Sequence, residues 1–209
     1  MRFTRFRGPV HQFPRVEKAL MIDAVLTAHF GGPVRGRRVL DIGCGNGDIS
    51  QHFVPANEVH GVDVDDRRRP ENAGFAFDRV TSERLPFGDG FFDVVISNHV
   101  IEHVVDQPLH LSEMRRVLRA DGCVYLATPN RSSPIMAGHV ANEQVLRYRE
   151  MRPLFERMGF RVRDFSVAIV RDTRAFRGDM PDLGWLPAAA VRLLLPWFPS
   201  HVFILEPHR

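Results

Sequence analysis

The spacing of hydrophobic residues along the chain predicts helices that alternate with short buried strands. Apolar residues fall at helical intervals from Arg15 to Phe30, where a Gly-Gly-Pro sequence ends the run. The apolar stretches Val39–Ile42 and Glu58–Asp63 are too short for helices and suit strands that are buried on both faces. A helix that begins at Asp48 and stops near Phe53 connects them. This order of elements favours an α/β fold.

The alternation continues to the end of the chain. The further elements that we expect are a short third strand at Phe75–Phe77, a strand at Phe91–Ser97, a helix that stops at Ala120-Asp121-Gly122, a strand at Cys123–Thr128, a helix over about 143–158, a strand at Phe160–Val170, a helix at Pro187–Leu195 and a last strand at His201–Leu205. Residues 1–14 are predicted to form an arm or lid, and 171–184 a long connection.

Length and composition predict one globular domain. The 209 residues suffice for a single core, and 44% hydrophobic and 25% charged residues exclude the disordered and membrane classes. We divide the domain into an N-terminal arm and helix (1–34), a core (35–170) and a C-terminal part (171–209). Two cysteines cannot form a disulfide framework or a metal site, and no apolar signal segment follows Arg2, Arg5 and Arg7. A reducing, cytoplasmic setting is therefore expected.

The most apolar segment of the chain runs from Trp185 to Leu205. Prolines and Arg192 interrupt it before it reaches the roughly 20 residues that a membrane span needs. Core packing, a pocket lid and a peripheral membrane contact all remain open for this segment.

The net charge of +3 does not predict a nucleic-acid surface. The basic residues are nearly all arginines, Lys18 is the only lysine, and the densest cluster is the short run Arg67-Arg68-Arg69. Nucleic acid is therefore not an expected partner.

A glycine-rich turn follows the first predicted strand. Gly43, Gly45 and Gly47 are spaced two apart, which leaves bare backbone N–H groups next to the start of a helix. The turn lacks the Gly-Lys-Ser/Thr ending of a phosphate loop, and Asp41 precedes it. The spacing favours S-adenosylmethionine over a dinucleotide, whose fingerprint is G-x-G-x-x-G; the alternative is a simple strand-to-helix turn.

Asp63 closes the second predicted strand, sixteen residues after Gly47. At the carboxyl end of a parallel strand, an acidic side chain can accept both hydroxyls of a ribose. The alternative is that Asp63 caps the following helix, and the two roles can coexist.

Five motifs in order connect this sequence to a known family. They are Val39–Gly47, Gly61-Val62-Asp63, Leu85-Pro86-Phe87, Phe92-Asp93-Val94-Val95 and Glu102-His103-Val104. Over about residues 35–165 the chain resembles the class I S-adenosylmethionine-dependent methyltransferases, and within them the type-11 and ubiquinone-biosynthesis group. The resemblance implies an α/β, Rossmann-like, doubly wound sheet of seven mostly parallel strands in a single domain, with an antiparallel last strand at His201–Leu205.

The resemblance also implies where the cofactor binds. The methionine part would face Asp41 and the backbone of Gly43, Cys44, Gly45, Asn46 and Gly47. Asp63 would bind the ribose hydroxyls and Val64 would pack on the adenine. Thr81 stands where the family commonly has an acidic residue for the adenine amine, so Ser82 or Glu83 would take over that contact. Asn98 and His99, at the end of the fourth strand, would meet the methionine ammonium through the main chain.

Histidines are the candidate catalytic residues. Methyl transfer from a sulfonium mainly requires alignment of the acceptor and exclusion of water, but a hydroxyl acceptor benefits from a base, for which histidine is suited. His99, His103 and His139 lie at predicted strand ends or loops near the cofactor. For His99 the alternative is a backbone contact only, for His103 a pocket wall, and His139 lies in a variable loop where the family places substrate residues.

These observations predict a methyltransferase for a small-molecule acceptor. O-methylation of a secondary-metabolite, sugar or quinone-like compound leads, with N-methylation next. A nucleic-acid methyltransferase is disfavoured because the chain lacks an Asn/Asp-Pro-Pro-Tyr/Phe run and neither cysteine follows a proline. The third alternative is a non-catalytic module that only binds S-adenosylmethionine. No metal is expected, and no motif specifies the acceptor or the oligomeric state.

Overall fold

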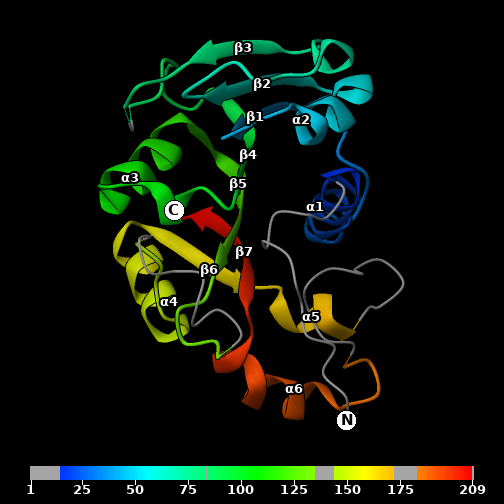
Figure 1. The fold of residues 1–209 in the computed structure, drawn as a ribbon, viewed down its shortest axis with the longest axis vertical. Helices are drawn as coiled ribbons and strands as arrows, with labels where there is room; N and C mark the ends of the chain where they lie inside the picture. The colour runs from blue at the N-terminus through cyan, green and yellow to red at the C-terminus, as the bar shows by residue number, and fades with distance from the viewer. Residues whose placement is uncertain (1–14, 83, 135–143, 172–182, 209) are drawn as a thin grey trace.

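A single seven-stranded sheet forms the centre of the molecule. The computed structural model describes residues 15–82, 84–134, 144–171 and 183–208. The strands are β1 (Arg38–Ile42), β2 (Glu58–Asp63), β3 (Ala76–Arg79), β4 (Phe92–Asn98), β5 (Leu118–Pro129), β6 (Phe160–Asp164) and β7 (Ser200–Pro207), in the spatial order β3-β2-β1-β4-β5-β7-β6. Strands β1 to β5 pair in parallel, and β7 is antiparallel to both of its neighbours. The predicted α/β class and antiparallel last strand are confirmed (Figure 1).

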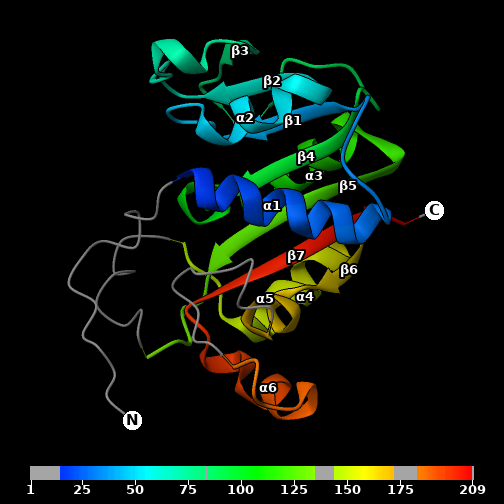
Figure 2. The same cartoon turned by 90° about the vertical axis from the view of Figure 1, so that its right-hand side faces the viewer.

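Helices cover both faces of the sheet. They are α1 (Arg15–Phe30), α2 (Asp48–Phe53), α3 (Gln107–Val117), α4 (Tyr148–Arg157), α5 (Ser166–Arg171) and α6 (Ala188–Leu194), with short 3₁₀ turns η1 (Val54–Ala56), η2 (Pro70–Asn72), η3 (Ile101–His103) and η4 (Leu195–Trp197). Helices α1, α2 and α5 lie on one face and α3 and α4 on the other (Figures 1 and 2).

The central strands are buried on both faces, which explains their nearly continuous apolar sequences. In β4, Val95 packs into the core beneath α3 and α4, while its neighbours Val94 and Ile96 pack into the core beneath α1 and α2. All three side chains are fully buried. Because successive side chains of a strand point to opposite faces, β4 contributes to two separate hydrophobic cores, one on each side of the sheet.

The parallel pairing brings the carboxyl ends of three strands to one edge of the sheet. Ile42 of β1 pairs with Val62 of β2 on one side and with Ser97 of β4 on the other. The residues that follow in each strand or turn therefore lie next to one another. In open α/β sheets, ligands bind at such an edge.

The structure corrects several predicted boundaries. The helix expected from about residue 143 begins only at Tyr148. The strand expected over Phe160–Val170 ends at Asp164, and the chain then forms α5, because the Asp164 carboxylate accepts the backbone N–H of Ser166 at 2.8 Å and turns the chain. The fifth strand begins at Leu118, not at Cys123, since Leu118 already pairs with Phe92 ahead of an irregularity in the register. The predictions for 1–14, for 135–143 and for most of the 171–184 connection lie outside the described residues.

The apolar C-terminal segment divides between core and surface. Val191, Leu195 and Phe198 are buried with Val170 of α5, which confirms core packing for this side of α6. Leu193 of α6 and Trp197 of η4, by contrast, have 74% and 55% of their surfaces exposed. Across the described residues, no helix combines the length and the apolar character needed to cross a bilayer.

Candidate functional site

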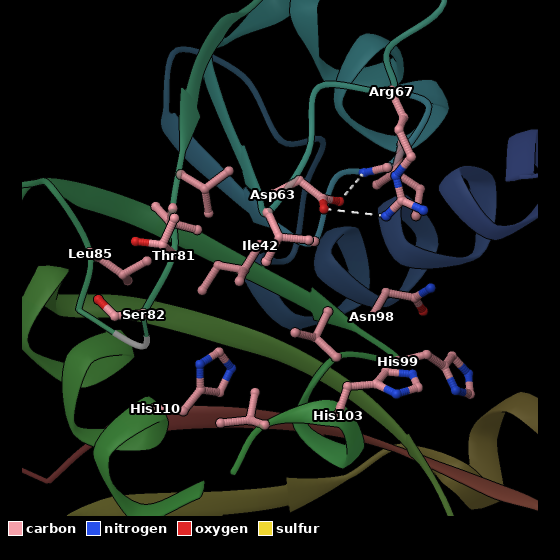
Figure 3. A pocket seen from close by; sticks show the side chains of 18 of the residues that line it. Ile42, Asp63, Arg67, Thr81, Ser82, Leu85, Asn98, His99, His103 and His110 are labelled. Carbon is pink, nitrogen blue, oxygen red and sulfur yellow. Dashed lines mark hydrogen bonds and ion pairs between the residues drawn. The ribbon is translucent and has the colours of Figure 1, made fainter. Parts of the chain in front are cut away.

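A cavity of about 630 Å³ lies at the carboxyl ends of β1, β2 and β4. Eight of the predicted site residues line it: Gly43, Gly45, Asp63, Val64, Ser82, Asn98, His99 and His103. Figure 3 shows Asp63 and Ile42 on one side of this space and the histidines of the β4–α3 segment on the other. The cavity is therefore built by several separate motifs of the sequence.

The glycine turn folds back onto the end of β2. The backbone N–H groups of Gly43 and Cys44 both donate to the carbonyl of Val62, at 2.8 and 3.1 Å. Gly43 has φ of 70°, and a Cβ placed on it would lie 2.6 Å from Cγ2 of Val100. Both the left-handed backbone and the close approach of Val100 require glycine at this position.

Asp63 joins the glycine turn to the end of β2. Its side chain is buried, and Oδ2 accepts the backbone N–H of Gly45 at 2.8 Å. Oδ1 lies 3.3 Å from Nη2 of Arg67, whose side chain is 65% exposed. The next helical turn begins only at Pro70, with Arg69 as its N-cap, so Asp63 does not cap it. The carboxylate instead fixes the turn and faces the cavity.

The end of β4 carries two polar side chains into the cavity wall. Oδ1 of Asn98 is buried and has no hydrogen-bond partner within the described part of the chain. His99, the next residue, has φ of 58°, and its Nδ1 lies 3.2 Å from Oε1 of the buried Glu102. A buried acceptor without a partner is costly in a native protein, so Asn98 is suited to receive a ligand donor.

A comparison with known protein families identifies the family of this chain. The model of a family described as "Methyltransferase domain" matches residues 15–165. The chain belongs to this methyltransferase-domain family.

Individual relatives of the domain carry related names. A ubiquinone biosynthesis O-methyltransferase of Sinorhizobium medicae (strain WSM419) is 33% identical over 160 residues, which cover 69% of this chain and 64% of the relative. The chain thus spans slightly less than two thirds of the length of that curated relative.

Two solved structures share the fold. A putative methyltransferase, in complex with the Haloferax volcanii Trm112 methyltransferase activator, aligns with a TM-score of 0.65 at 18% identity over 93% of this chain and 92% of its own. The 1,6-didemethyltoxoflavin-N1-methyltransferase of Burkholderia thailandensis, with bound 1,6-didemethyltoxoflavin and S-adenosylhomocysteine, aligns with a TM-score of 0.60 at 19% identity over 92% and 80%.

Four predicted cofactor residues do not line the cavity, namely Asp41, Cys44, Asn46 and Gly47. Asp41 is buried and accepts the Ser50 hydroxyl of α2 at 2.6 Å. Asn46 donates its side-chain amide to Asp48, and the N–H of Gly47 donates to the carbonyl of Cys44. These residues brace the glycine turn against α2, and their direct contacts with a cofactor stay predictions.

Cys44 is held as a neutral thiol. Burial, followed by the nearby carboxylates of Asp41 and Asp63, raises the pKa of Cys44 to about 12. The thiol is therefore protonated at neutral pH and is a poor nucleophile.

The domain also places residues in the cavity that the sequence did not indicate. Lys18 of α1, His110 of α3 and Arg67 line it beside the predicted residues. Thr81, at the position where the family commonly has an acidic residue, lines it as well. No local motif marks Lys18 or His110, because only the packing of their helices brings them to this edge. Predicted residues Glu83 and His139 lie outside the described part of the chain. Within that part, no group of three or more His, Cys, Asp or Glu side chains is arranged to hold a metal ion.

Proposed function

We propose that this protein is an S-adenosylmethionine-dependent methyltransferase that acts on the hydroxyl group of a small molecule. The observation that carries the proposal is the cavity in which the glycine turn, Asp63 and the unpartnered oxygen of Asn98 meet. Family membership and the names of the relatives support it. The two cysteines of the chain are buried and free, which suits the cytoplasmic setting that we also propose.

The residues around the cavity fit the chemical groups of S-adenosylmethionine. Asp63 offers carboxylate oxygens to the ribose hydroxyls, and Val64 offers an apolar surface, 57% exposed, to the adenine ring. Ser82 and Thr81 lie beside it with hydroxyl groups for the ring edge. Oδ1 of Asn98 can accept a hydrogen bond from the ammonium group. When bound, S-adenosylmethionine supplies a methyl group on a positively charged sulfur.

The protein's own contribution is mainly alignment. Holding two reactants in line and excluding water can supply much of the rate enhancement of a displacement reaction. His99, Val100 and Val104 line the same cavity, and in this proposal they form the wall against which the acceptor would lie. A base in this wall would remove the hydroxyl proton.

Proteins that share this fold are named for methylation of different atoms, so the fold alone does not identify the acceptor. The Burkholderia structure is named for N-methylation, whereas the Sinorhizobium relative is named for O-methylation in ubiquinone biosynthesis. We propose a hydroxyl acceptor on a secondary-metabolite, sugar or quinone-like compound because the relatives with higher sequence identity carry the O-methyltransferase name.

Calorimetry with S-adenosylmethionine and S-adenosylhomocysteine tests the proposal. Both ligands are expected to bind. A protein that binds neither would overturn the methyltransferase assignment. A screen of phenols, catechols and amines with methyl-labelled cofactor then identifies the acceptor, and binding without transfer to any of them would favour the non-catalytic module.

Replacing Arg67 by alanine is expected to tighten the binding of S-adenosylhomocysteine by up to about fivefold. The guanidinium group lies 3.3 Å from Oδ1 of Asp63 and so competes with the ribose for the carboxylate. An exposed ion pair of this kind contributes about 0–1 kcal/mol, which limits the gain. Calorimetry measures the change.

The matched control is Arg161→Ala, which removes another exposed arginine, paired with Glu206 and absent from the cavity lining. Its affinity for S-adenosylhomocysteine should equal that of the wild type. Weaker binding by Arg67→Ala would contradict the prediction and indicate that Arg67 contacts the cofactor itself.

A further inference from the structure

A buried carboxylate lies directly behind one of the cavity histidines. Glu102 belongs to η3, and only 3% of its surface is exposed. Its Oε1 lies 3.2 Å from Nδ1 of His99, and its Oε2 accepts the hydroxyl of Thr128 at 3.4 Å. A buried carboxylate needs such partners because the loss of hydration would otherwise disfavour its charge. The pair therefore forms one connected unit of side chains.

The backbone of His99 is restrained as well as its ring. His99 is the single non-glycine residue with positive φ in the described chain, at 58°. Its N–H donates to the carbonyl of Ala127 in β5 at 2.9 Å. Non-glycine residues in the left-handed region occur more often at functional sites, where surrounding contacts hold them in place. Here the main-chain bond to β5 and the side-chain contact with Glu102 together fix the imidazole at the cavity wall.

We propose that His99 is the general base of the methyl transfer and that Glu102 is its positioning residue. The inference rests on the function proposed above and names the base within the same site. In this proposal the Glu102 carboxylate, whose Oε1 lies 3.2 Å from Nδ1 of His99, keeps the ring proton on Nδ1, so that Nε2 carries the lone pair. The acceptor oxygen loses its proton to Nε2 as its new bond to the methyl carbon forms, and the pair of the breaking sulfur–carbon bond stays on sulfur.

The surroundings favour His99 over His103 in this role. The imidazole of His99 is 19% exposed and has the buried carboxylate at one nitrogen. His103 lines the same cavity, but it is an exposed residue at the end of η3. Figure 3 shows both on the same side of the cavity. A base that is shielded from water interacts more strongly with a bound acceptor than one that is exposed to solvent.

The tautomer of His99 provides a test that needs no methyl acceptor. In ¹⁵N–¹H spectra of the wild-type protein, recorded where the ring is neutral, the ring proton of His99 is expected on Nδ1. Free imidazole side chains favour the Nε2–H form, so a wild-type Nε2–H tautomer would overturn the proposal without any variant. Glu102→Gln, whose amide can donate to Nδ1, should move the proton to Nε2.

Kinetics with catechol as the acceptor provide the second arm. Glu102→Gln is expected to lower kcat ten- to hundredfold while KM for catechol and the Kd for S-adenosylhomocysteine change less than twofold, because a wrong tautomer removes the base and leaves the binding groups in place. His99→Asn should lower kcat at least as much. If Glu102→Gln keeps both the Nδ1–H tautomer and full turnover, the proposal is wrong.

Thr128→Val serves as the matched control, since it removes the other hydrogen bond to Glu102 and preserves shape. Its His99 tautomer should match that of the wild type. A wild-type protein that fails to bind S-adenosylhomocysteine would overturn the proposed function, whereas the tautomer would still report on the His99–Glu102 pair. If catechol is not methylated, the spectra still test the His99–Glu102 pair, and the acceptor found in the screen replaces catechol in the kinetics.

Discussion

Replacing Gly43 by alanine should abolish measurable binding of S-adenosylhomocysteine and lower the free energy of unfolding by about 2–5 kcal/mol. The left-handed backbone at φ of 70° costs a non-glycine residue roughly 1–2 kcal/mol. The new Cβ would also lie 2.6 Å from Cγ2 of Val100, and displacing a packed side chain costs about 1–3 kcal/mol. Because Val100 and Gly43 both line the cavity, the shift deforms the site itself. Urea unfolding and calorimetry measure the two effects.

Gly36→Ala is the matched control for backbone strain. Gly36 has nearly the same φ, 64°, but a Cβ there would have no atom within 4 Å. It should therefore lose only about 1–2 kcal/mol of stability and bind S-adenosylhomocysteine as the wild type does. Equal effects of the two substitutions on binding would show that the contact with Val100 is unimportant for the cavity.

Replacing Asp63 by alanine should weaken the binding of S-adenosylhomocysteine about ten- to hundredfold, which corresponds to about 1–3 kcal/mol. The substitution removes the proposed acceptor of the ribose hydroxyls. It also leaves the N–H of Gly45, now bonded to Oδ2 at 2.8 Å, without its carboxylate. Both losses act on the same ligand, so the effect exceeds that of any exposed residue of the site. Calorimetry measures it.

Two further variants separate these contributions. Asp65→Ala removes a nearby carboxylate that is 59% exposed and should leave the affinity unchanged. Asp63→Asn retains an oxygen that can accept the Gly45 N–H but loses the charge, so its affinity should fall between wild type and Asp63→Ala. Unchanged affinity in Asp63→Ala would mean that Asp63 serves only to hold the turn.

The sequence was sufficient to predict the fold because its strands are short, buried and separated by clear turn signals. Strand β2 and helices α1 and α2 occupy the predicted ranges. The last strand, β7, was expected to be antiparallel from the resemblance alone, because no periodicity in the sequence distinguishes a parallel strand from an antiparallel one.

The prediction of a strand through residues 165–170 was wrong for a local reason, since these residues include α5. Val167, Ile169 and Val170 are residues with β preference, and the alternation from Phe160 continues into them. The Asp164 carboxylate, bonded to the N–H of Ser166, outweighs that preference and starts a helix. An acidic residue two positions before a serine was the signal that could have indicated the turn.

The sequence also predicted only part of the cavity lining. Motifs on single strand ends predicted Asp63, Asn98 and His99, because the edge of a parallel sheet brings strand ends together. Lys18 and His110 reach the same cavity from helices, and their position depends on how α1 and α3 pack. The partnership of His99 with Glu102 likewise depends on the single turn of η3, whose geometry no sequence spacing specifies.

The position of β7 affects how the protein can form during translation. Strand β6 pairs with β7 and with no other strand of the described sheet, so residues 160–164 leave the ribosome well before the strand that they need. Meanwhile β5 presents an unpaired backbone edge along Val124–Pro129, the part that later pairs with β7. Strands β1 to β5 can assemble first, but β6 and β7 join the sheet only after residues 200–207 have been made. A nascent chain that pauses in this interval is therefore the form most exposed to aggregation and to chaperones.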